Sequence, residues 1–359
     1  MKTSIVAINQ RLGQVSREKI NGFPCFAGAV SAIILLLSIW TWNRMNHLEL
    51  FAQIFAVTAP IFSLVIIGLL LKRFNLLSEG FISGASMLVY KATLPTLLGL
   101  ATYRADVVGL LDSVLFGYYI LANFAVVILM GFIAYQWIRP DQRAVFIQAG
   151  FRGNHGIIAL ALVLSLYGDE GLQVAGLMAG LAGILNNGLS VVLFSIFSTR
   201  YRPTPLVVAK EVVLNPMIIG VLIGALLSLL QWRLPLWVEE SAQLFGSMSL
   251  PLALLCIGAT LSLKAFRLSG WLAVNATLVK LIWVPLVFTA LGAYLGITGM
   301  ELGTLFLFLA SPTAAASYVM AKIAGDDDEL AANIIVLTTF VSMITITFGL
   351  YLLQLLSLI

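Results

Sequence analysis

The sequence has few charged residues, and this shortage excludes most soluble folds. Asp, Glu, Lys and Arg make up 10% of the 359 residues, whereas a soluble domain carries about 25%. Hydrophobic residues make up 60% and the mean hydropathy is +1.03, so no polar outer layer is left to cover a soluble core. Long continuous apolar runs without strand-like alternation predict an all-α polytopic membrane protein and disfavour a β-barrel.

Metal-ligating and redox residues are also scarce. The chain has two cysteines, Cys25 and Cys256, and two histidines. Both cysteines lie in apolar runs, which favours small buried residues over a disulfide, and zinc-site spacing is missing. We therefore expect no metal and no cofactor. There is no P-loop for ATP, and a net charge of +4 requires no nucleic-acid partner.

Acidic residues are missing from the centres of the apolar runs. All sixteen Asp and Glu lie in expected loops, at the ends of expected spans or in the N-terminal region. Antiporters that carry a cation on a buried carboxylate need an acid at membrane depth, so this mechanism is disfavoured. A membrane-embedded enzyme is disfavoured as well, because His155 has no acidic neighbour in its span.

The apolar runs predict ten transmembrane helices, separated by turn and charge signals. We expect them at residues 51–71, 81–101, 113–137, 142–166, 172–198, 206–230, 237–261, 270–296, 301–323 and 330–357. The first, third, fifth, seventh and ninth loops hold ten Lys and Arg, and the opposite side holds three. The positive-inside rule therefore places the odd loops in the cytoplasm and both ends of the ten-helix unit outside.

A further apolar run at 25–42 leaves two interpretations open. Four cations precede it, which is the pattern of a signal anchor and would add an eleventh helix. Alternatively, Met45 is the true translation start. In either case we expect an extension over 1–44, a first five-helix half over 45–202 and a second over 203–359.

An internal repeat relates the two halves. Three pairs lie 156 positions apart: Pro60 and Pro216, Gly68 and Gly224, and Pro95 and Pro251. The segments "PIFSLVIIGLLL" and "PMIIGVLIGALL" match at six of twelve positions. Each half has an odd number of helices, so the second half enters the membrane inverted, as in many secondary transporters. We expect the four prolines to mark hinge or scaffold positions.

The fourth and ninth helices carry the signals of broken helices. Gly153 and Gly156 weaken the fourth, and Pro312 removes a hydrogen bond from the ninth. By the offset of 156, the counterpart of Asn154 in the second half is Ala310, which begins the stretch "ASPTAAASY". Broken backbone at membrane depth lines a cavity, and half-helix N-termini favour an anion there.

Several stretches in order resemble the auxin efflux carrier family, which includes plant auxin carriers and bacterial permeases for malonate-like acids. They are "PIFSLVIIGLLLKRFNLLSEG", "LVYKATLPTLL", "FRGNHGIIALAL" and "ASPTAAASYVMAKIAGDDDELAANIIVLTT". The resemblance covers about residues 45–357 and favours Met45 as the start. It departs from the family at Ala161, which stands where the family has a proline, so the fourth helix must break on glycine alone.

The resemblance implies an architecture and a mechanism. Helices 1, 2, 6 and 7 would form a scaffold, and helices 3–5 and 8–10 a transport domain. The broken helices 4 and 9 would cross at the substrate site, and an elevator-like shift would give alternating access. A homodimer through the scaffold helices is also implied.

Polar residues inside the spans are the candidate substrate site. Asn154 and Gly153 lie at the break. Arg152 either attracts a carboxylate, pairs with backbone carbonyls or snorkels to the cytoplasmic face. His155 either carries a proton or is a packed, hydrogen-bonded residue. The other predicted lining residues are Lys91, Lys280, Asn187 with its neighbour Asn186, Ser311, Pro312, Thr313 and Ser317.

These features together predict a secondary carrier for a small organic anion, a mono- or dicarboxylate. It would lie in the lipid bilayer of the cytoplasmic membrane and be driven by the membrane potential or a proton gradient. The alternative is a membrane sensor or receptor that keeps the fold and binds its ligand without turnover.

Overall fold

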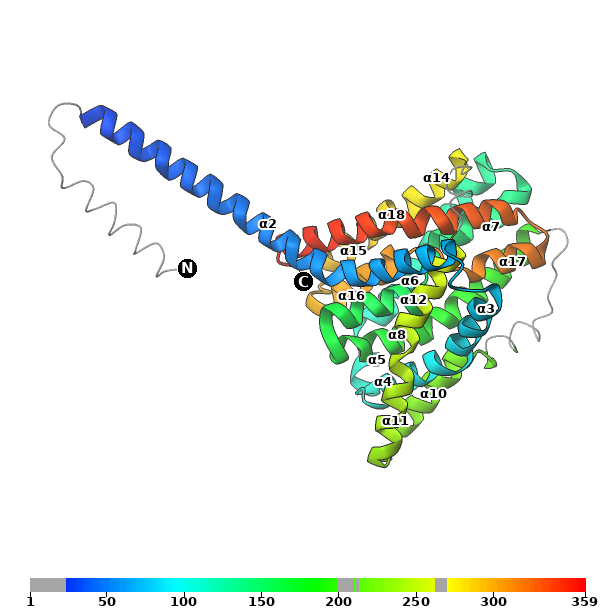
Figure 1. Cartoon of the computed structure of the whole chain (residues 1–359). Coiled ribbons are helices and arrows are strands. Elements are labelled where there is room, and N and C mark those ends of the chain that lie inside the picture. Colours follow the sequence, from blue (N-terminus) through cyan, green and yellow to red (C-terminus); the bar gives the residue numbers. More distant parts are fainter. Residues whose placement is uncertain (1–23, 199–209, 211–212, 262–269) are drawn as a thin grey trace. The chain divides into compact units, whose positions relative to one another are not determined.

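The computed structural model describes residues 24–198, 210, 213–261 and 270–359, without the side chains of 24–46 and 111 (Figure 1). The chain separates into two compact units, residues 1–52 and 53–359. Each unit is described by itself. In the first, residues from Pro24 onward are helical, and residues 1–23 lie outside the described part. The predicted boundaries at 44 and 202 stay predictions.

Within the described residues, all the regular elements are helices. They are α2 (Pro24–Arg73), α3 (Glu79–Leu88), η1 (Val89–Thr93), α4 (Leu94–Tyr103), α5 (Val107–Leu111), α6 (Val114–Trp137), α7 (Pro140–Phe151), η2 (His155–Ala159), α8 (Leu160–Phe197), α10 (Pro216–Leu229), α11 (Leu236–Ser247), α12 (Ser249–Thr260), α14 (Trp271–Leu278), η3 (Val279–Trp283), α15 (Val284–Tyr294), α16 (Gly299–Ala310), α17 (Ala316–Ala324) and α18 (Asp328–Leu355). Seven helical stretches of the described chain are long and apolar enough to cross a membrane, and α10 and α16 are shorter apolar helices. The all-helical, polytopic prediction is therefore confirmed.

Local sequence explains where helices bend and begin. α8 covers parts of two predicted spans and bends at Gly168, where φ is 63° and ψ is −150°. Such a backbone is open to glycine and strained for other residues. α10 is described from Pro216, and the predicted start of this span at 206 lies outside the described residues. The Asn215 side chain accepts a hydrogen bond from the Met217 amide at 3.0 Å, and proline suits the first helical turn because its missing N–H has no partner there.

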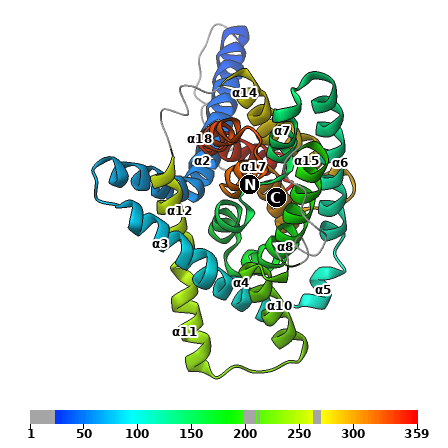
Figure 2. The same cartoon turned by 90° about the vertical axis from the view of Figure 1, so that its right-hand side faces the viewer.

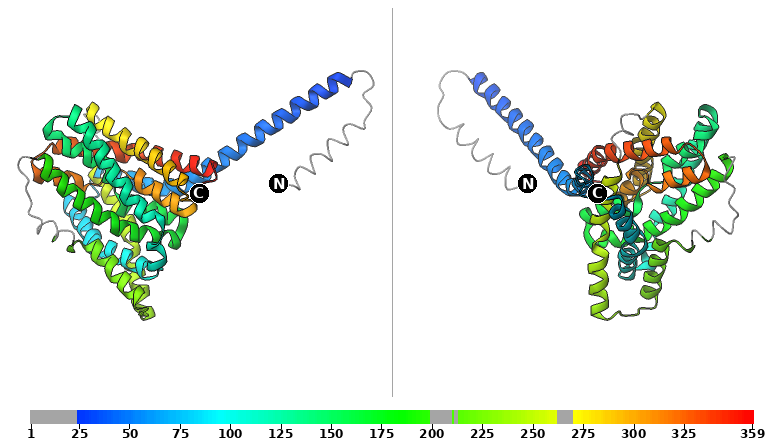
Figure 3. Two further views of the ribbon diagram at one scale, coloured as in Figure 1. Left: turned by 180° about the vertical axis from the view of Figure 1, so that it is seen from behind. Right: turned by 45° about the vertical axis from the view of Figure 1, so that its right-hand side comes forward.

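The helices of the second unit gather in two groups. α3, α4, α10, α11 and α12 lie on one side, and α6, α7, α14, α15 and α18 lie on the other (Figure 2). In the first group α4 packs along α10, and in the second α14 packs against α18 (Figure 3). α8 contacts helices of both groups, so it connects them.

Glycines allow two pairs of helices to touch backbone to backbone. A Cβ on Gly224 of α10 would lie 2.1 Å from the carbonyl oxygen of Gly99 in α4. A Cβ on Gly68 of α2 would lie 2.1 Å from the carbonyl oxygen of Leu255 in α12. These two contacts correspond to each other in the repeat. Adding 156 to Gly68 gives Gly224, and adding 156 to Gly99 gives Leu255. The sequence repeat is therefore matched by a repeated packing contact.

We expect Gly224→Ala to lower the thermal stability of the purified protein in detergent. The added methyl group meets the backbone of α4, which cannot turn away as a side chain can, and overpacking of this kind costs about 1–3 kcal/mol. Gly84→Ala is the control, because a Cβ at Gly84 meets nothing within 4 Å. Equal melting temperatures for Gly224→Ala and wild type would contradict the tight α4–α10 contact.

An acidic turn joins α17 to α18 outside the predicted spans. The Asp327 carboxylate caps α18 by accepting a hydrogen bond from the Leu330 amide at 2.8 Å. It also accepts one from Gln142 Nε2 of α7 at 2.8 Å. Burial and the nearby Asp141 raise the pKa of Asp326 from 3.8 to about 6, and a hydrogen bond with the Ser198 side chain opposes this shift.

The raised pKa of Asp326 makes stability depend on pH. The folded state binds the proton of the Asp326 carboxyl more tightly than the unfolded state does. The stabilisation that comes from the protonated carboxyl is therefore lost as the pH rises from about 4 to about 6. We expect the melting temperature to fall across this window, and to fall less in Asp326→Asn, which cannot ionise. Glu329→Gln, at an exposed neighbour, should keep the wild-type fall. An unchanged fall in Asp326→Asn would contradict this assignment.

Candidate functional site

Two interrupted helices meet through their backbones at the centre of the second unit. The Asn154 amide donates to the carbonyl oxygen of Pro312 at 2.7 Å, and the Ala314 amide donates to that of Arg152 at 3.2 Å. Gly153 and Thr313 lie between them as an antiparallel bridge. Because an unpaired backbone group in hydrocarbon is costly, each break supplies the partners that the other needs.

The crossing relates the two halves by a different offset from the one found in the sequence. Gly153 lies opposite Thr313, 160 positions later, so the counterpart of Asn154 in the crossing is Ala314, four residues after Ala310. The two hydrogen bonds correspond to each other at an offset of 160. The donors are Asn154 and Ala314, and the acceptors are Arg152 and Pro312, 160 positions apart in each case. The sequence offset of 156 was set by residues outside the breaks, and the two halves differ by four residues before the crossing.

Glycine makes this close approach possible. A Cβ on Gly153 would lie 2.2 Å from Ser311 Oγ and 2.6 Å from His155 Nε2. The fourth helix leaves helical geometry at Arg152 and Asn154, with ψ of 86° and 62°, and resumes in the π-helix η2. Ala161 lies beyond η2 in α8. The break therefore forms on glycine without the proline that the family resemblance led us to expect.

A cavity of about 390 Å³ opens beside the crossing, and we call it the crossover cavity. Its polar and sulfur-bearing lining residues are Ser86, Tyr90, Arg152, Asn154, His155, Asn186, Asn187, Asn215, Met217, Cys256 and Thr260. Gly153 and Ala314–Ala316 complete it at the two breaks. Among these described lining residues Arg152 is a cation and no residue is acidic. Four asparagine amides and one guanidinium suit an anion.

Arg152 is fixed by α8. Its Nη1 donates to the Asn186 carbonyl oxygen at 3.0 Å and to Ser190 Oγ at 2.9 Å, and its Nη2 donates to Asn187 Oδ1 at 2.9 Å. The residue is buried. Of the three predicted roles, pairing with polar groups near the break agrees with this geometry, and snorkelling does not.

His155 is buried at the wall of the cavity. The Asn186 amide nitrogen lies 3.0 Å from His155 Nδ1, and the Tyr119 hydroxyl lies 3.5 Å from Nε2. The ring stacks on Phe308 with centroids 5.2 Å apart, and it also hydrogen-bonds the Phe308 backbone. His155 is thus packed and hydrogen-bonded while still facing the cavity.

Asn154 is the half-buried residue at the break. Its backbone is held by the crossing, and its side chain caps neither neighbouring helix. Among the hydrogen bonds of the described chain, none involves its side-chain amide. This amide is therefore a donor and acceptor placed in the cavity without an internal partner.

The predicted hydroxyls of the ninth helix lie behind the cavity rather than in its lining. Ser311 Oγ donates to the Phe308 carbonyl oxygen at 2.8 Å. The Thr313 amide donates to Thr338 Oγ1 of α18 at 3.1 Å, which supports the break. The hydroxyls of Thr313 and Ser317 are buried and find no partner among the described residues. Pro312 contributes its carbonyl oxygen to the crossing.

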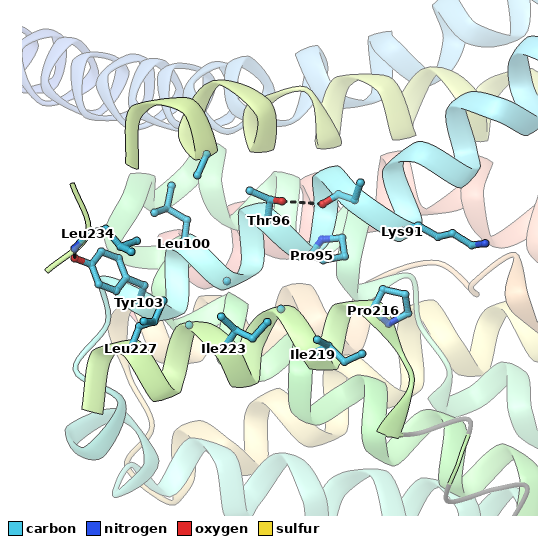
Figure 4. Close-up of a pocket in the computed structure, with 15 residues that line it drawn as sticks. Lys91, Pro95, Thr96, Leu100, Tyr103, Pro216, Ile219, Ile223, Leu227 and Leu234 are labelled. Atoms are coloured by element: carbon cyan, nitrogen blue, oxygen red, sulfur yellow. Dashed lines mark hydrogen bonds between the residues drawn. The ribbon is translucent and has the colours of Figure 1, made fainter. Parts of the chain in front are cut away.

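The two predicted lysines lie away from the crossover cavity. Lys91 is exposed at one end of a separate, mostly apolar groove of about 460 Å³ between α4 and α10. Tyr103 lies at its other end, and Pro95 and Pro216 face each other across it (Figure 4). Lys280 is 1% exposed in η3, near enough to His155 to act on it electrostatically.

The four predicted hinge prolines sit in different local structures. Pro95 and Pro216 occupy first turns, of α4 and α10. Pro251 follows the junction of α11 and α12. Pro60 lies inside the continuous helix α2.

Sequence reasoning missed the lining residues of the other helix group. Ser86, Tyr90 and Cys256 come from α3, η1 and α12, and nothing in their local sequence points to a cavity. Asn215 could have been found, because Asn followed by Pro marks a helix start. The first turn of α10 begins directly after Asn215, and both Asn215 and Met217 line the cavity.

We expect Arg152→Lys to lower the melting temperature in detergent. A single ammonium cannot span the three acceptors that the planar guanidinium bridges, and buried acceptors left unpaired cost about 1–3 kcal/mol. Arg233→Lys, at an exposed position, is the matched control. If both variants melt like wild type, Arg152 does not fix the break to α8.

The comparison with known protein families agrees with this geometry. Residues 53–350 match the sequence profile of the family described as membrane transport protein. A comparison with curated proteins finds no match. Since the matched residues cover most of the chain, it belongs to the membrane transport protein family, which contains auxin efflux carrier-like permeases.

Proposed function

We propose that this transporter carries a small organic anion, a mono- or dicarboxylate, through the crossover cavity. The side-chain amide of Asn154 carries the proposal, because the crossing holds the backbone of this residue at the cavity and its side chain has no hydrogen-bond partner among the described residues. Arg152 adds positive charge from the wall, and the described lining has no carboxylate to repel an anion. A carboxylate can accept hydrogen bonds from the asparagine amides on several sides.

The proposal includes ten spanning helices in two inverted halves. The glycine contacts related by 156 positions and the hydrogen bonds related by 160 support it. The bend at Gly168 would divide α8 into two of these spans. The short helices α10 and α16 would each form part of a span that is broken or begins inside the membrane.

Alternating access would follow from movement of one helix group past the other. The lining residues Ser86, Asn187 and Thr260 lie toward the loops that the positive-inside rule places in the cytoplasm. Leu100, Asp169 and Leu172, which lie toward the opposite side, line a void of only about 10 Å³. These two features support assigning a cytoplasm-facing state within the proposal. An elevator-like shift of α6–α8 and α14–α18 would carry the site outward.

The cytoplasmic membrane is the proposed location, and a homodimer through the helices of the first group is the proposed assembly. A sensor or receptor with the same cavity is the second candidate function. It would bind the same anions, so turnover and not binding separates the two.

Uptake into proteoliposomes tests the proposal. Purified protein is reconstituted, and labelled malonate, succinate and lactate are offered with and without an imposed membrane potential. We expect saturable uptake of at least one of them. Asn154→Ala should reduce the initial rate about tenfold to a hundredfold, as loss of a hydrogen bond to a charged ligand does.

Asn275→Ala is the matched control. Asn275 lies on α14, and its side chain bonds the Trp271 carbonyl oxygen of its own helix at 2.9 Å, so uptake should stay near that of wild type. The carrier proposal fails if none of the three anions is taken up. Binding without uptake would favour the sensor.

A further inference from the structure

His155 occupies a position that anion binding alone does not require. It is one of two histidines in the chain, and the only one in the crossover cavity. Asn154 already supplies a donor for a carboxylate, and Arg152 supplies a positive charge in the wall. An imidazole is the side chain whose ordinary charge change falls nearest neutral pH, so its presence here calls for a separate account.

The groups around His155 are cationic or neutral. Lys280 of η3 and Arg152, which follows α7, act on it electrostatically. Tyr119 of α6 lies at its edge, Asn186 of α8 bonds it and Phe308 of α16 stacks on it. Across the cavity the titratable groups are Tyr90 of η1 and Cys256 of α12. No carboxylate faces it among the residues that the structure describes.

A proton on His155 would therefore add a positive charge beside the Arg152 guanidinium and the Lys280 amine. Like charges in a poorly solvated region repel strongly, so the empty cavity disfavours the protonated ring. An anion in the cavity supplies the missing negative charge. Binding of the anion and binding of the proton then favour each other, and by linkage the effect is reciprocal.

The Asn186 side chain can hydrogen-bond both the neutral and the protonated ring of His155. Its Nδ2 donates to His155 Nδ1, while its Oδ1 is buried without a partner in the described structure. A half-turn of the amide would exchange donor and acceptor, so that Oδ1 accepts from a protonated Nδ1. Arg152 meanwhile holds the Asn186 backbone through its carbonyl oxygen, and the turn needs no movement of α8.

We propose that His155 takes up the proton that accompanies the anion, so that transport is proton–anion symport. This rests on the proposed carrier function and adds its coupling ion. Each cycle carries one proton from the medium on the imidazole, with the anion beside it, and releases both on the other side.

Direct titration of His155 tests the proposal without transport. His47→Gln leaves a single histidine in the chain, whose nitrogen-15 signals report its protonation. At a fixed pH near neutral we expect malonate, succinate or lactate to raise the protonated fraction, with about a tenfold gain in proton affinity. Chloride at the same ionic strength is the control. A protonated fraction that none of the three anions changes would overturn the proposal.

Uptake driven by a pH gradient separates this proposal from the carrier function. With liposomes alkaline inside, one coupled proton changes the equilibrium accumulation about tenfold per pH unit. Asn186→Asp, which keeps the size of Asn186 and pairs permanently with a protonated ring, should abolish that dependence. If wild-type uptake does not depend on the pH gradient, the symport proposal is overturned and the carrier proposal stands. Absence of uptake of all three anions overturns both.

Discussion

The crossing of two broken helices is the contact on which the rest of the structure depends. Two backbone hydrogen bonds, from Asn154 to Pro312 and from Ala314 to Arg152, pair groups that would otherwise lie unsatisfied at membrane depth. Each such group costs several kcal/mol in hydrocarbon. Neither break is therefore stable alone, and glycine is needed at position 153 because a Cβ there would collide with Ser311 Oγ and the His155 ring.

The crossing also determines how charge is distributed in the cavity. Arg152 points from the break into α8, where the Asn186 carbonyl, the Asn187 amide and Ser190 hold it. The positive charge is fixed in the wall, and the neutral amide of Asn154 is presented to the cavity. In the proposed function an anion would be attracted without forming a tight ion pair, and a carrier must be able to release its substrate as well as bind it.

Much of this could be predicted from the sequence. The spans follow from apolar runs, the breaks from Gly153 and Pro312, and the scarcity of acid near the site from composition. The register of the crossing could not be predicted, because the repeat offset of 156 was set by Pro60, Gly68 and Pro95 and not by the breaks. Ser86, Tyr90 and Cys256 reach the cavity only through packing between distant helices. Lys91 and Lys280 both lie in the middle of predicted spans, and the sequence does not distinguish their surroundings. In the structure Lys91 lines a groove and Lys280 is buried in the interior.

The central claim is that a carboxylate occupies the crossover cavity beside Asn154. Cys256 lines that cavity, so its alkylation by a small neutral thiol reagent reports occupancy directly in Cys25→Ser protein. The account predicts that malonate, succinate or lactate slows alkylation of Cys256, and that Asn154→Ala removes this protection. An alkylation rate that stays the same under saturating amounts of an anion the protein transports would contradict it.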